Sequence, residues 1–366
     1  MILWVGGIAN TSSYAETARR ILPLLPDVGI LPTEPQNAVT WEDDPRLPLL
    51  RRRIIPGDPL QLLQAPHVVP LYHMVPGLLH DELPSGWVYS GWDATPYPQV
   101  WVENLNTQRG FLTWSHWSAT IAQASGVTVP IHVLPIPYDP PAGGSPLPRV
   151  AGTVFGMVSQ FVPRKMLLEA IEWFWQTFTD QDDVALIVKG MPSSVLTESM
   201  IWRDLHYRKR AYRIPPTYVW LGTWTPAEMT AFYAGIDVLV HPSRGEGFGM
   251  PHLEAAWYHT ALIVPDQAGG YEDWLPAEGA WRIPTTLSSI PAGGIPDWQE
   301  PGMQWWGTHP DDWKHALWEA AHHPAQREAY ATVAQHAAQT YGQPERIKAL
   351  WQTLWPQLDG ASVSGA

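Results

Sequence analysis

Short apolar runs alternate with helical patterns along most of this chain. Runs such as 1–5 and 67–72 have the length and composition of buried strands. Between such runs, apolar residues return every three or four positions, as they do from Ser13 onward, where Ser13 and Glu16 fit a helix capping box. The alternation predicts an α/β protein whose mostly parallel sheets carry helices on both faces.

A stretch rich in proline and glycine, at 138–150, separates two such alternating halves. The second half begins with apolar runs at 154–158 and 184–188, again with helical patterns between them. We therefore expect a first domain at 1–145 and a second at 146–340. A ligand cleft is expected between them, beyond the carboxyl ends of the strands.

The pattern changes towards the carboxyl terminus. Residues 283–307 have the composition of a long loop, without a clear strand or helix period. The tail from 310 to 357 is helical, with interruptions expected near Pro324 and Pro344.

Length and composition narrow the class of protein. The chain has 366 residues, 45% of them hydrophobic and 16% charged, which favours a globular protein of two domains. No apolar run reaches the ~18–20 residues of a membrane helix, so we expect no integral membrane segment and a cytoplasmic location. Cysteine is absent from the sequence, which excludes disulfides, cysteine metal sites and thiol nucleophiles.

The charge and the aromatic content bear on possible ligands. The net charge of −13 disfavours loose binding to nucleic acid or anionic lipid. Two basic clusters, Arg51–Arg53 and Arg203–Arg213, are expected to be solvated surface, although either could line a groove for phosphates. The 22 tryptophans suggest stacking on sugars or bases, while core packing explains most of them.

The stretch 241–254 carries the most information about chemistry. It follows a predicted strand, opens a predicted helix and has three glycines at alternate positions, which let a ligand approach the backbone closely. The first amides of the helix offer a positive end for phosphate or sugar oxygens. Glu246 and Glu254 can accept hydrogen bonds from neighbouring hydroxyls. By itself, such a stretch also fits a glycine-rich helix start with two surface acids.

The run 246–254 reads EGFGMPHLE and resembles the Glu-x7-Glu signature of family-four retaining glycosyltransferases. The run 261–265 and the turn 269–272 resemble the family's next strand and its Gly-Gly-x-Glu turn, and 155–170 resembles its strand–loop–helix. The resemblance implies the GT-B fold, in which two Rossmann-like domains face each other across a cleft. It also implies that a C-terminal helix at 341–366 crosses back to the first domain.

The resemblance assigns the donor site residue by residue. Glu254 would bind the ribose hydroxyls of a nucleotide-sugar, and Glu246 would contact the transferred sugar. Lys165 and Arg164 would face the diphosphate and stabilise the charge that grows on the leaving phosphate.

Further donor contacts follow from the same resemblance. The family's usual arginine after the first strand of this domain is replaced here by Gln160, so Lys189 is a further candidate for the diphosphate. The other residues implied in donor binding are Gly6, Gly7, Gly247, Phe248, Gly249 and Met250.

The acceptor side is expected in the first half of the chain. Asp93, next to Trp92, belongs to a segment that resembles acceptor-domain sequences in part of the family. Its carboxylate could position or deprotonate the acceptor hydroxyl. His73 follows an apolar strand, where it is either a cleft residue or a hydrogen-bonded structural histidine.

No metal is needed in this scheme, because lysine, arginine and backbone amides neutralise the diphosphate. The string Asp180–Asp182 matches the Asp-x-Asp of metal-dependent transferases, but its polar surroundings favour a solvated surface. We expect no cofactor beyond the nucleotide-diphosphate sugar as co-substrate, with a UDP-sugar favoured.

The resemblance therefore implies an enzyme, a retaining glycosyltransferase that moves a sugar from a nucleotide-sugar to an acceptor hydroxyl. The acceptor is a saccharide, a lipid-linked glycan, a small metabolite or a modified DNA base. The alternative is a catalytically inactive sugar- or nucleotide-binding protein of the same fold, for which the replacement at Gln160 is the argument. An epimerase or phosphorylase of similar fold is disfavoured by the paired glutamates.

Overall fold

The computed structural model describes residues 1–10, 12–33, 44–140, 145–295 and 297–358, and the chain forms two compact units. The first unit contains Met1–Trp92, Pro96–Asp139 and the residues from Tyr341 onward. The second contains Asp93–Thr95 and Pro140–Thr340. Asp93–Thr95, which lies within the predicted first domain, thus groups with the second unit.

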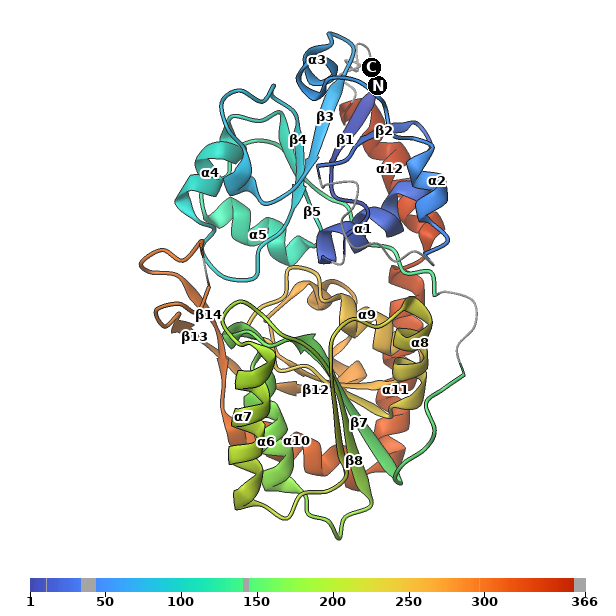
Figure 1. The fold of residues 1–366 in the computed structure, drawn as a ribbon, viewed down its shortest axis with the longest axis vertical. Coiled ribbons are helices and arrows are strands. Elements are labelled where there is room, and N and C mark those ends of the chain that lie inside the picture. The colour runs from blue at the N-terminus through green and yellow to red at the C-terminus, as the bar shows by residue number, and fades with distance from the viewer. Residues whose placement is uncertain (11, 34–43, 141–144, 296, 359–366) are drawn as a thin grey trace. The chain divides into compact units, whose positions relative to one another are not determined.

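A parallel sheet of six strands forms the centre of the first unit, in the order β2-β1-β3-β4-β5-β6 (Figure 1). Its strands are β1 (Ile2–Gly6), β2 (Val28–Leu31), β3 (Val69–His73), β4 (Trp87–Ser90), β5 (Gly110–Thr113) and β6 (Ile131–Val133). Its helices are α1 (Ser13–Ile21), α2 (Leu47–Arg51), α3 (Pro59–Gln64), α4 (Gln99–Asn106), α5 (His116–Ala124) and α12 (Pro344–Leu358).

Helix α12 completes the hydrophobic core of this unit. Ile347, Trp351 and Leu354 are buried in one cluster with Trp4 of β1. The indole N–H of Trp87 on β4 donates to the carbonyl of the last residue of α12, at 3.2 Å. Burial of these large side chains stabilises the contact by about 1.5–3 kcal/mol each, so the C-terminal helix is an integral part of the first unit.

A second parallel sheet of six strands, in the order β12-β11-β10-β7-β8-β9, organises the second unit. Its strands are β7 (Thr153–Gln160), β8 (Val184–Met191), β9 (Thr217–Leu221), β10 (Val238–Val240), β11 (Ala261–Pro265) and β12 (Ala280–Ile283). Its helices are α6 (Leu167–Thr177), α7 (Glu198–Arg208), α8 (Pro226–Gly235), α9 (Met250–Trp257), α10 (Pro310–His322) and α11 (Pro324–Tyr341).

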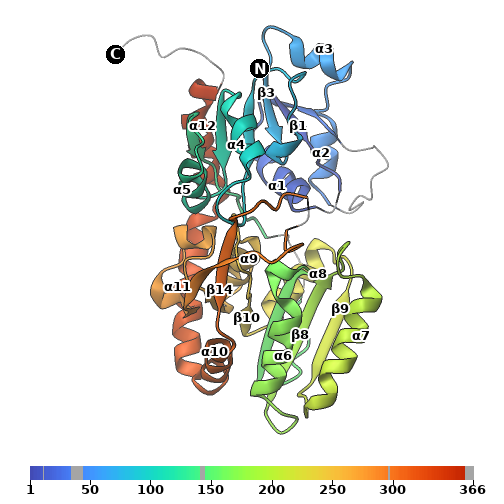
Figure 2. The ribbon, with the colours of Figure 1, turned by 90° about the vertical axis from the view of Figure 1, so that its left-hand side faces the viewer.

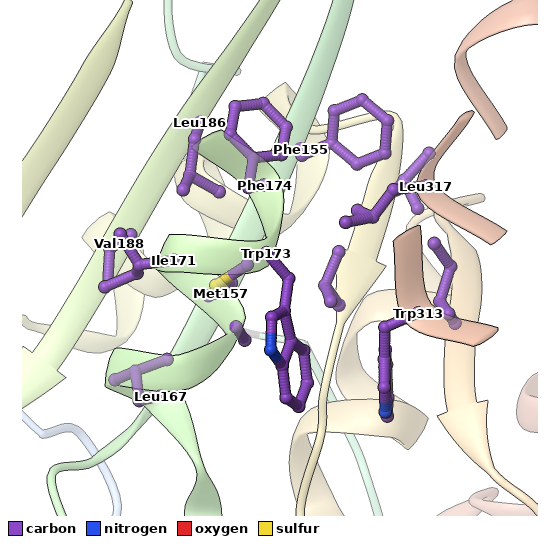
Figure 3. Close-up of a cluster of buried hydrophobic side chains, with 14 of the residues drawn as sticks. Phe155, Met157, Leu167, Ile171, Trp173, Phe174, Leu186, Val188, Trp313 and Leu317 are labelled. Atoms are coloured by element: carbon purple, nitrogen blue, oxygen red, sulfur yellow. The ribbon is translucent and has the colours of Figure 1, made fainter. Parts of the chain in front are cut away.

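The core of the second unit lies between this sheet and one layer of helices. Figure 2 shows α6 and α7 beside β8 and β9. In the close-up of Figure 3, Trp173 of α6 lies beside Trp313 of α10, and the two rings stack with centroids 5.8 Å apart. Phe155 of β7 packs against Phe174 in the same cluster. Much of the tryptophan in this chain therefore serves packing.

One element differs from the sequence-based expectation. The stretch 283–307, expected as a loop, contains an antiparallel pair of strands, β13 (Thr285–Ser289) and β14 (Gln304–Thr308). The serines, threonines and glutamine of these strands hide the alternation by which a strand is recognised. Within the described residues, no helix is long and apolar enough to cross a membrane.

Candidate active site

The candidate site lies in the second unit, where a glycine-rich loop joins β10 to α9. Gly249 is the residue before α9 and has φ +83°, in the left-handed region that favours glycine. A Cβ atom at Gly249 would lie 2.8 Å from His252 Nδ1. A Cβ atom at Gly245 would lie 1.8 Å from the carbonyl oxygen of Asp93. The loop therefore needs glycine both for its conformation and for its close packing.

The backbone of Glu246 is fixed on both sides. Its N–H donates to the Ala268 carbonyl at 3.0 Å, and its carbonyl accepts from Gly270 N–H at 2.8 Å. These bonds attach the loop to the turn after β11, the segment that the sequence analysis singled out as Gly-Gly-x-Glu. As a result, the side chain of Glu246 points in a direction that the backbone determines.

Several donors converge on the carboxylate of Glu246. Lys165 Nζ and His241 Nε2, the latter at 3.0 Å, both contact its Oε1 atom. A guanidinium nitrogen of Arg164 lies 3.5 Å from the same oxygen. The side chain of Glu246 is only 8% exposed, so these contacts act with little screening by water.

The charges of this cluster set its protonation state. Burial alone would raise the pKa of Glu246, but Lys165 and His241, followed by Arg164, outweigh it and hold the pKa well below its ordinary value. Burial and the neighbouring Arg164 lower the pKa of Lys165, while Glu246 and Asp93 oppose this. Burial also lowers the pKa of His241, so its ring is neutral at pH 7 and donates from Nε2. Glu246 is therefore an ionised acceptor.

The turn after β7 supplies Arg164 and Lys165. Both belong to a short 3₁₀ turn, Pro163–Lys165, which is followed by Met166 in the left-handed conformation at φ +51°. The backbone carbonyl of Arg164 accepts from Arg244 N–H at 2.9 Å, which holds the turn against the glycine-rich loop. The guanidinium of Arg164 donates to the Gly245 carbonyl and pairs with Asp93 at 2.8 Å.

Glu254 is the fifth residue of α9. Its Oε2 atom accepts a hydrogen bond from the Tyr233 hydroxyl at 2.7 Å, in a buried setting. Burial lowers the pKa of Lys189 on β8, and the charge of Glu254 acts against that shift. The structure thus brings Lys189 within electrostatic reach of Glu254.

Three aromatic rings line the inner side of the glycine-rich loop, and sequence reasoning assigned them no role. His252 is fully buried, with its ring 4.5 Å from that of His241 and 4.3 Å from that of Tyr271. Burial holds the pKa of His252 well below its ordinary value. The Tyr271 hydroxyl donates to the Pro265 carbonyl at 2.6 Å. These rings support the loop from beneath, a role that no short sequence motif indicates.

The predicted residues of the first half lie in the first unit, except Asp93. His73, at the end of β3, is buried, with its ring nitrogens 2.9 Å and 3.0 Å from the carbonyl oxygens of Tyr89 and Tyr14. Of the two alternatives for this histidine, these contacts fit the structural one. Gly6 ends β1, where a Cβ atom would lie 2.8 Å from the His73 carbonyl oxygen, and Gly7 follows it in the turn.

Trp92 has a packing role. It is 7% exposed, its indole N–H donates to the Pro96 carbonyl at 3.0 Å, and its ring lies 4.6 Å from that of Trp101. Asp93, expected on the acceptor side, contacts Arg164 and accepts from the amide of Gly247, at 2.6 Å. The local sequence could not indicate this contact, since it joins positions 154 residues apart.

The two basic clusters differ in their surroundings. In the cluster Arg203–Arg213, Arg208 pairs with Glu172 and Asp204, and Arg213 pairs with Asp180, the first residue of the Asp-x-Asp string. The side chains of Arg213 and Asp180 are largely exposed, as expected of a solvated surface. In the cluster Arg51–Arg53, that expectation is wrong for Arg53, because its partly buried guanidinium donates to the backbone carbonyls of Leu22, Leu25 and Val28.

Comparisons with known proteins bear on the family and the fold. The sequence model of the family "Glycosyl transferases group 1" matches residues 147–279. A D-inositol 3-phosphate glycosyltransferase of Corynebacterium kroppenstedtii is 25% identical over 204 residues, which are 54% of this chain and 41% of that protein. The match thus spans less than half of that relative's length.

Solved structures with similar folds extend over nearly the whole chain. Anabaena HepE, in complex with UDP and glucose, has a TM-score of 0.70 at 13% identity, covering 98% of this chain and 99% of that one. The trehalose-6-phosphate synthase OtsA has a TM-score of 0.65 at 13% identity, covering 97% and 99%. At this identity the likeness concerns the fold. The chain therefore has the GT-B fold, and its residues 147–279 match the sequence model of the group 1 glycosyl transferases.

Proposed function

We propose that this protein is a retaining glycosyltransferase that moves a sugar from a nucleotide-diphosphate sugar to a hydroxyl of a saccharide. The observation that carries the proposal is the buried, ionised Glu246, held by Lys165, His241 and Arg164 at the start of the glycine-rich loop. It lies inside the segment that matches the group 1 family. A UDP-sugar is the favoured donor, because the HepE structure contains UDP and glucose.

In this proposal, Lys165 and Arg164 act on the donor diphosphate. Negative charge grows on the leaving phosphate as the bond to the sugar breaks, and cations held in a partly buried site stabilise that charge strongly. Both side chains are less than one-fifth exposed, which favours such an effect. The scheme uses no metal ion, since the two side chains and the loop amides supply the positive groups.

Two acidic residues divide the recognition of the donor. Glu254, fixed by Tyr233, would accept hydrogen bonds from the ribose hydroxyls. Glu246 would accept from hydroxyls of the transferred sugar, and the amides of the loop from Gly247 to Met250 would complete the sugar site. For the acceptor, we favour a saccharide over a modified DNA base, because TarM, a further structural neighbour, was crystallised with fondaparinux and α-GlcNAc-glycerol.

Donor turnover tests the proposal. UDP-glucose and UDP-N-acetylglucosamine are incubated with the protein, with and without saccharide acceptors and with and without a chelator, and release of UDP is measured. Lys165→Ala should lower the turnover rate more than donor affinity, and the double variant with Arg164→Ala more still. Lys209→Ala, a lysine exposed on the surface, is the matched control and should behave like the parent.

The outcomes separate the alternatives. Tight binding of UDP without turnover of any donor would favour the inactive binding protein. Loss of activity with chelator, restored by magnesium or manganese, would contradict the metal-independent scheme. The anomeric configuration of the product, read by NMR, tests retention, and an inverted product would contradict it. Full activity of the double variant would exclude Lys165 and Arg164 from catalysis.

A further inference from the structure

We infer that Asp93 is an internal competitor of the donor: its carboxylate holds the groups that receive the donor phosphate, and donor binding must displace it. The inference rests on the proposed function for the identity of the ligand. The structural observation is that Asp93, from the segment Asp93–Thr95, contacts the glycine-rich loop and the turn after β7 at once. The inference therefore concerns which ligands can bind at this site.

Both oxygens of the Asp93 carboxylate are bound. The Oδ1 atom accepts from Gly247 N–H at 2.6 Å, and the Oδ2 atom lies 2.8 Å from a terminal nitrogen of Arg164. A backbone amide of a glycine-rich loop, together with a guanidinium, is a pair of donors that proteins use for phosphate oxygens. The carboxylate of Asp93 thus contacts these groups as a phosphate would.

The backbone around Asp93 is held firmly in place. The N–H of Thr95 donates to the Gln304 carbonyl at 2.9 Å, and the N–H of Gln304 donates back to Thr95 at 2.6 Å. On the other side, Gly245 packs so closely on the Asp93 carbonyl that no Cβ atom would fit between them. Strand β14 and the glycine-rich loop therefore fix the main chain of this segment.

Release of the two donors thus requires rotation of the Asp93 side chain alone. Rotation about its χ1 angle moves the carboxylate to another staggered position while the main chain stays fixed. The side chain is 32% exposed, so the rotated carboxylate can be hydrated. The hydrogen bond and the ion pair are lost together in that step. An incoming ligand that offers two phosphate oxygens replaces both contacts of the Asp93 carboxylate. A neutral sugar carries no negative charge and therefore does not replace the ion pair with Arg164.

The competition has a measurable size. An intramolecular competitor lowers the apparent affinity of a ligand by the fraction of molecules in which the site is open. The ion pair is partly exposed, so its contribution is moderate, and we expect its removal to tighten binding of a diphosphate by about tenfold. If Asp93 served only to position Arg164 for the donor, its removal would weaken binding. The two roles therefore differ in sign.

Binding of inorganic pyrophosphate and of UDP to the full chain, by titration calorimetry, tests the inference. Asp93→Ala should bind both about tenfold more tightly than the parent. Asp93→Asn should show a smaller gain, because its amide oxygen still accepts from Gly247 but no longer carries a charge. Asp81→Asn, an exposed aspartate with the same change of charge, should bind like the parent. Uridine, which lacks phosphate, should show no difference between parent and Asp93→Ala.

A second comparison assigns the gain to Arg164. In the Arg164→Ala background, the further change Asp93→Ala should produce a markedly smaller gain, since one of the two released donors is missing. Equal or weaker pyrophosphate binding by Asp93→Ala would overturn the inference. Pyrophosphate needs no nucleoside contacts, so this result is separate from the proposed function. Failure of the parent to turn over any UDP-sugar contradicts that function, whereas tighter pyrophosphate binding by Asp93→Ala still supports the competitor.

Discussion

The buried His73 makes the stability of the first unit depend on pH. Burial lowers the pKa of His73 from 6.5 to about 4, although the carbonyls of Tyr89 and Tyr14 act in the opposite direction. Above pH 6.5 the histidine is neutral in both the folded and the unfolded chain, so it has no pH effect there. Below pH 6.5, His73 becomes protonated in the unfolded chain, whereas in the folded chain it stays neutral until the pH approaches 4.

The free energy of unfolding should therefore decrease as the pH falls from about 6.5 to about 4. With these two pKa values, lowering the pH from 7 to 5 removes about 2 kcal/mol of stability through His73 alone. Glutamine at this position does not titrate. The destabilisation caused by His73→Gln should thus be about 2 kcal/mol smaller at pH 5 than at pH 7.

Urea unfolding of the parent and of His73→Gln at both pH values measures this difference. Hydrogen–deuterium exchange of peptides from β3 reports on the first unit, so unfolding of the second does not obscure the result. His80→Gln, at an exposed position, is the control for loss of an imidazole. If His73→Gln costs the same free energy at pH 7 and at pH 5, His73 titrates alike in both states, and the argument from burial is wrong.

Two further predictions concern the second unit. Glu254→Gln should weaken binding of UDP by about tenfold or more, because a charge-assisted hydrogen bond contributes about 1.5–3 kcal/mol; calorimetry that finds parental affinity would exclude Glu254 as the ribose ligand. Gly249→Ala should lower the melting temperature more than Gly293→Ala, since both glycines have positive φ but only Gly249 has His252 2.8 Å from its Cβ position. Equal shifts in a thermal melt would mean that the loop adapts without cost.

The central strands and helices could be predicted from the sequence because their signals are local. The run 154–158 lies within β7, and helix α1 begins at Ser13, close to the predicted start. The predicted capping box was wrong in detail, because Ser12 is the N-cap and accepts from Ala15 N–H, while the Glu16 carboxylate pairs with Arg19 and Arg20. In these segments, apolar spacing and helix starts depend on neighbours within a few positions. The β13–β14 pair was missed because its strands are held by cross-strand partners about 20 residues away, which the local pattern does not record.

In the candidate site, too, features with a local sequence signal could be predicted, and contacts between distant positions could not. The glycine-rich loop and the lysine after β7 were identified because the order of residues around them resembles a family signature. The contacts that set their charge state, Lys165 with Glu246 and Asp93 with Gly247, join positions 81 and 154 residues apart. Only the folded chain brings these residues together, so the ion pairing could not be derived from spacing. Tyr233, which fixes Glu254, was missed for the same reason.

The charges around the glycine-rich loop explain why an internal anion is present at all. Among the described residues of this cluster, Lys165 and Arg164 carry two positive charges, and Glu246 and Asp93 carry two negative ones, while His241 is neutral. Two partly buried cations without counter-charges would repel each other. Besides burial, the charge of Arg164 lowers the pKa of Lys165, so it disfavours the protonated form of the lysine.

Asp93 supplies the counter-charge when no donor is bound, and a diphosphate can replace it because it brings negative charge of its own. Glu246 is not exchanged in this way, since its side chain is only 8% exposed and its carboxylate is contacted by Lys165, His241 and Arg164. The two carboxylates near Arg164 therefore have different functions. In the proposed scheme, Glu246 is the fixed acceptor for the sugar, and Asp93 is the exchangeable partner whose displacement keeps the site electrically balanced in both states.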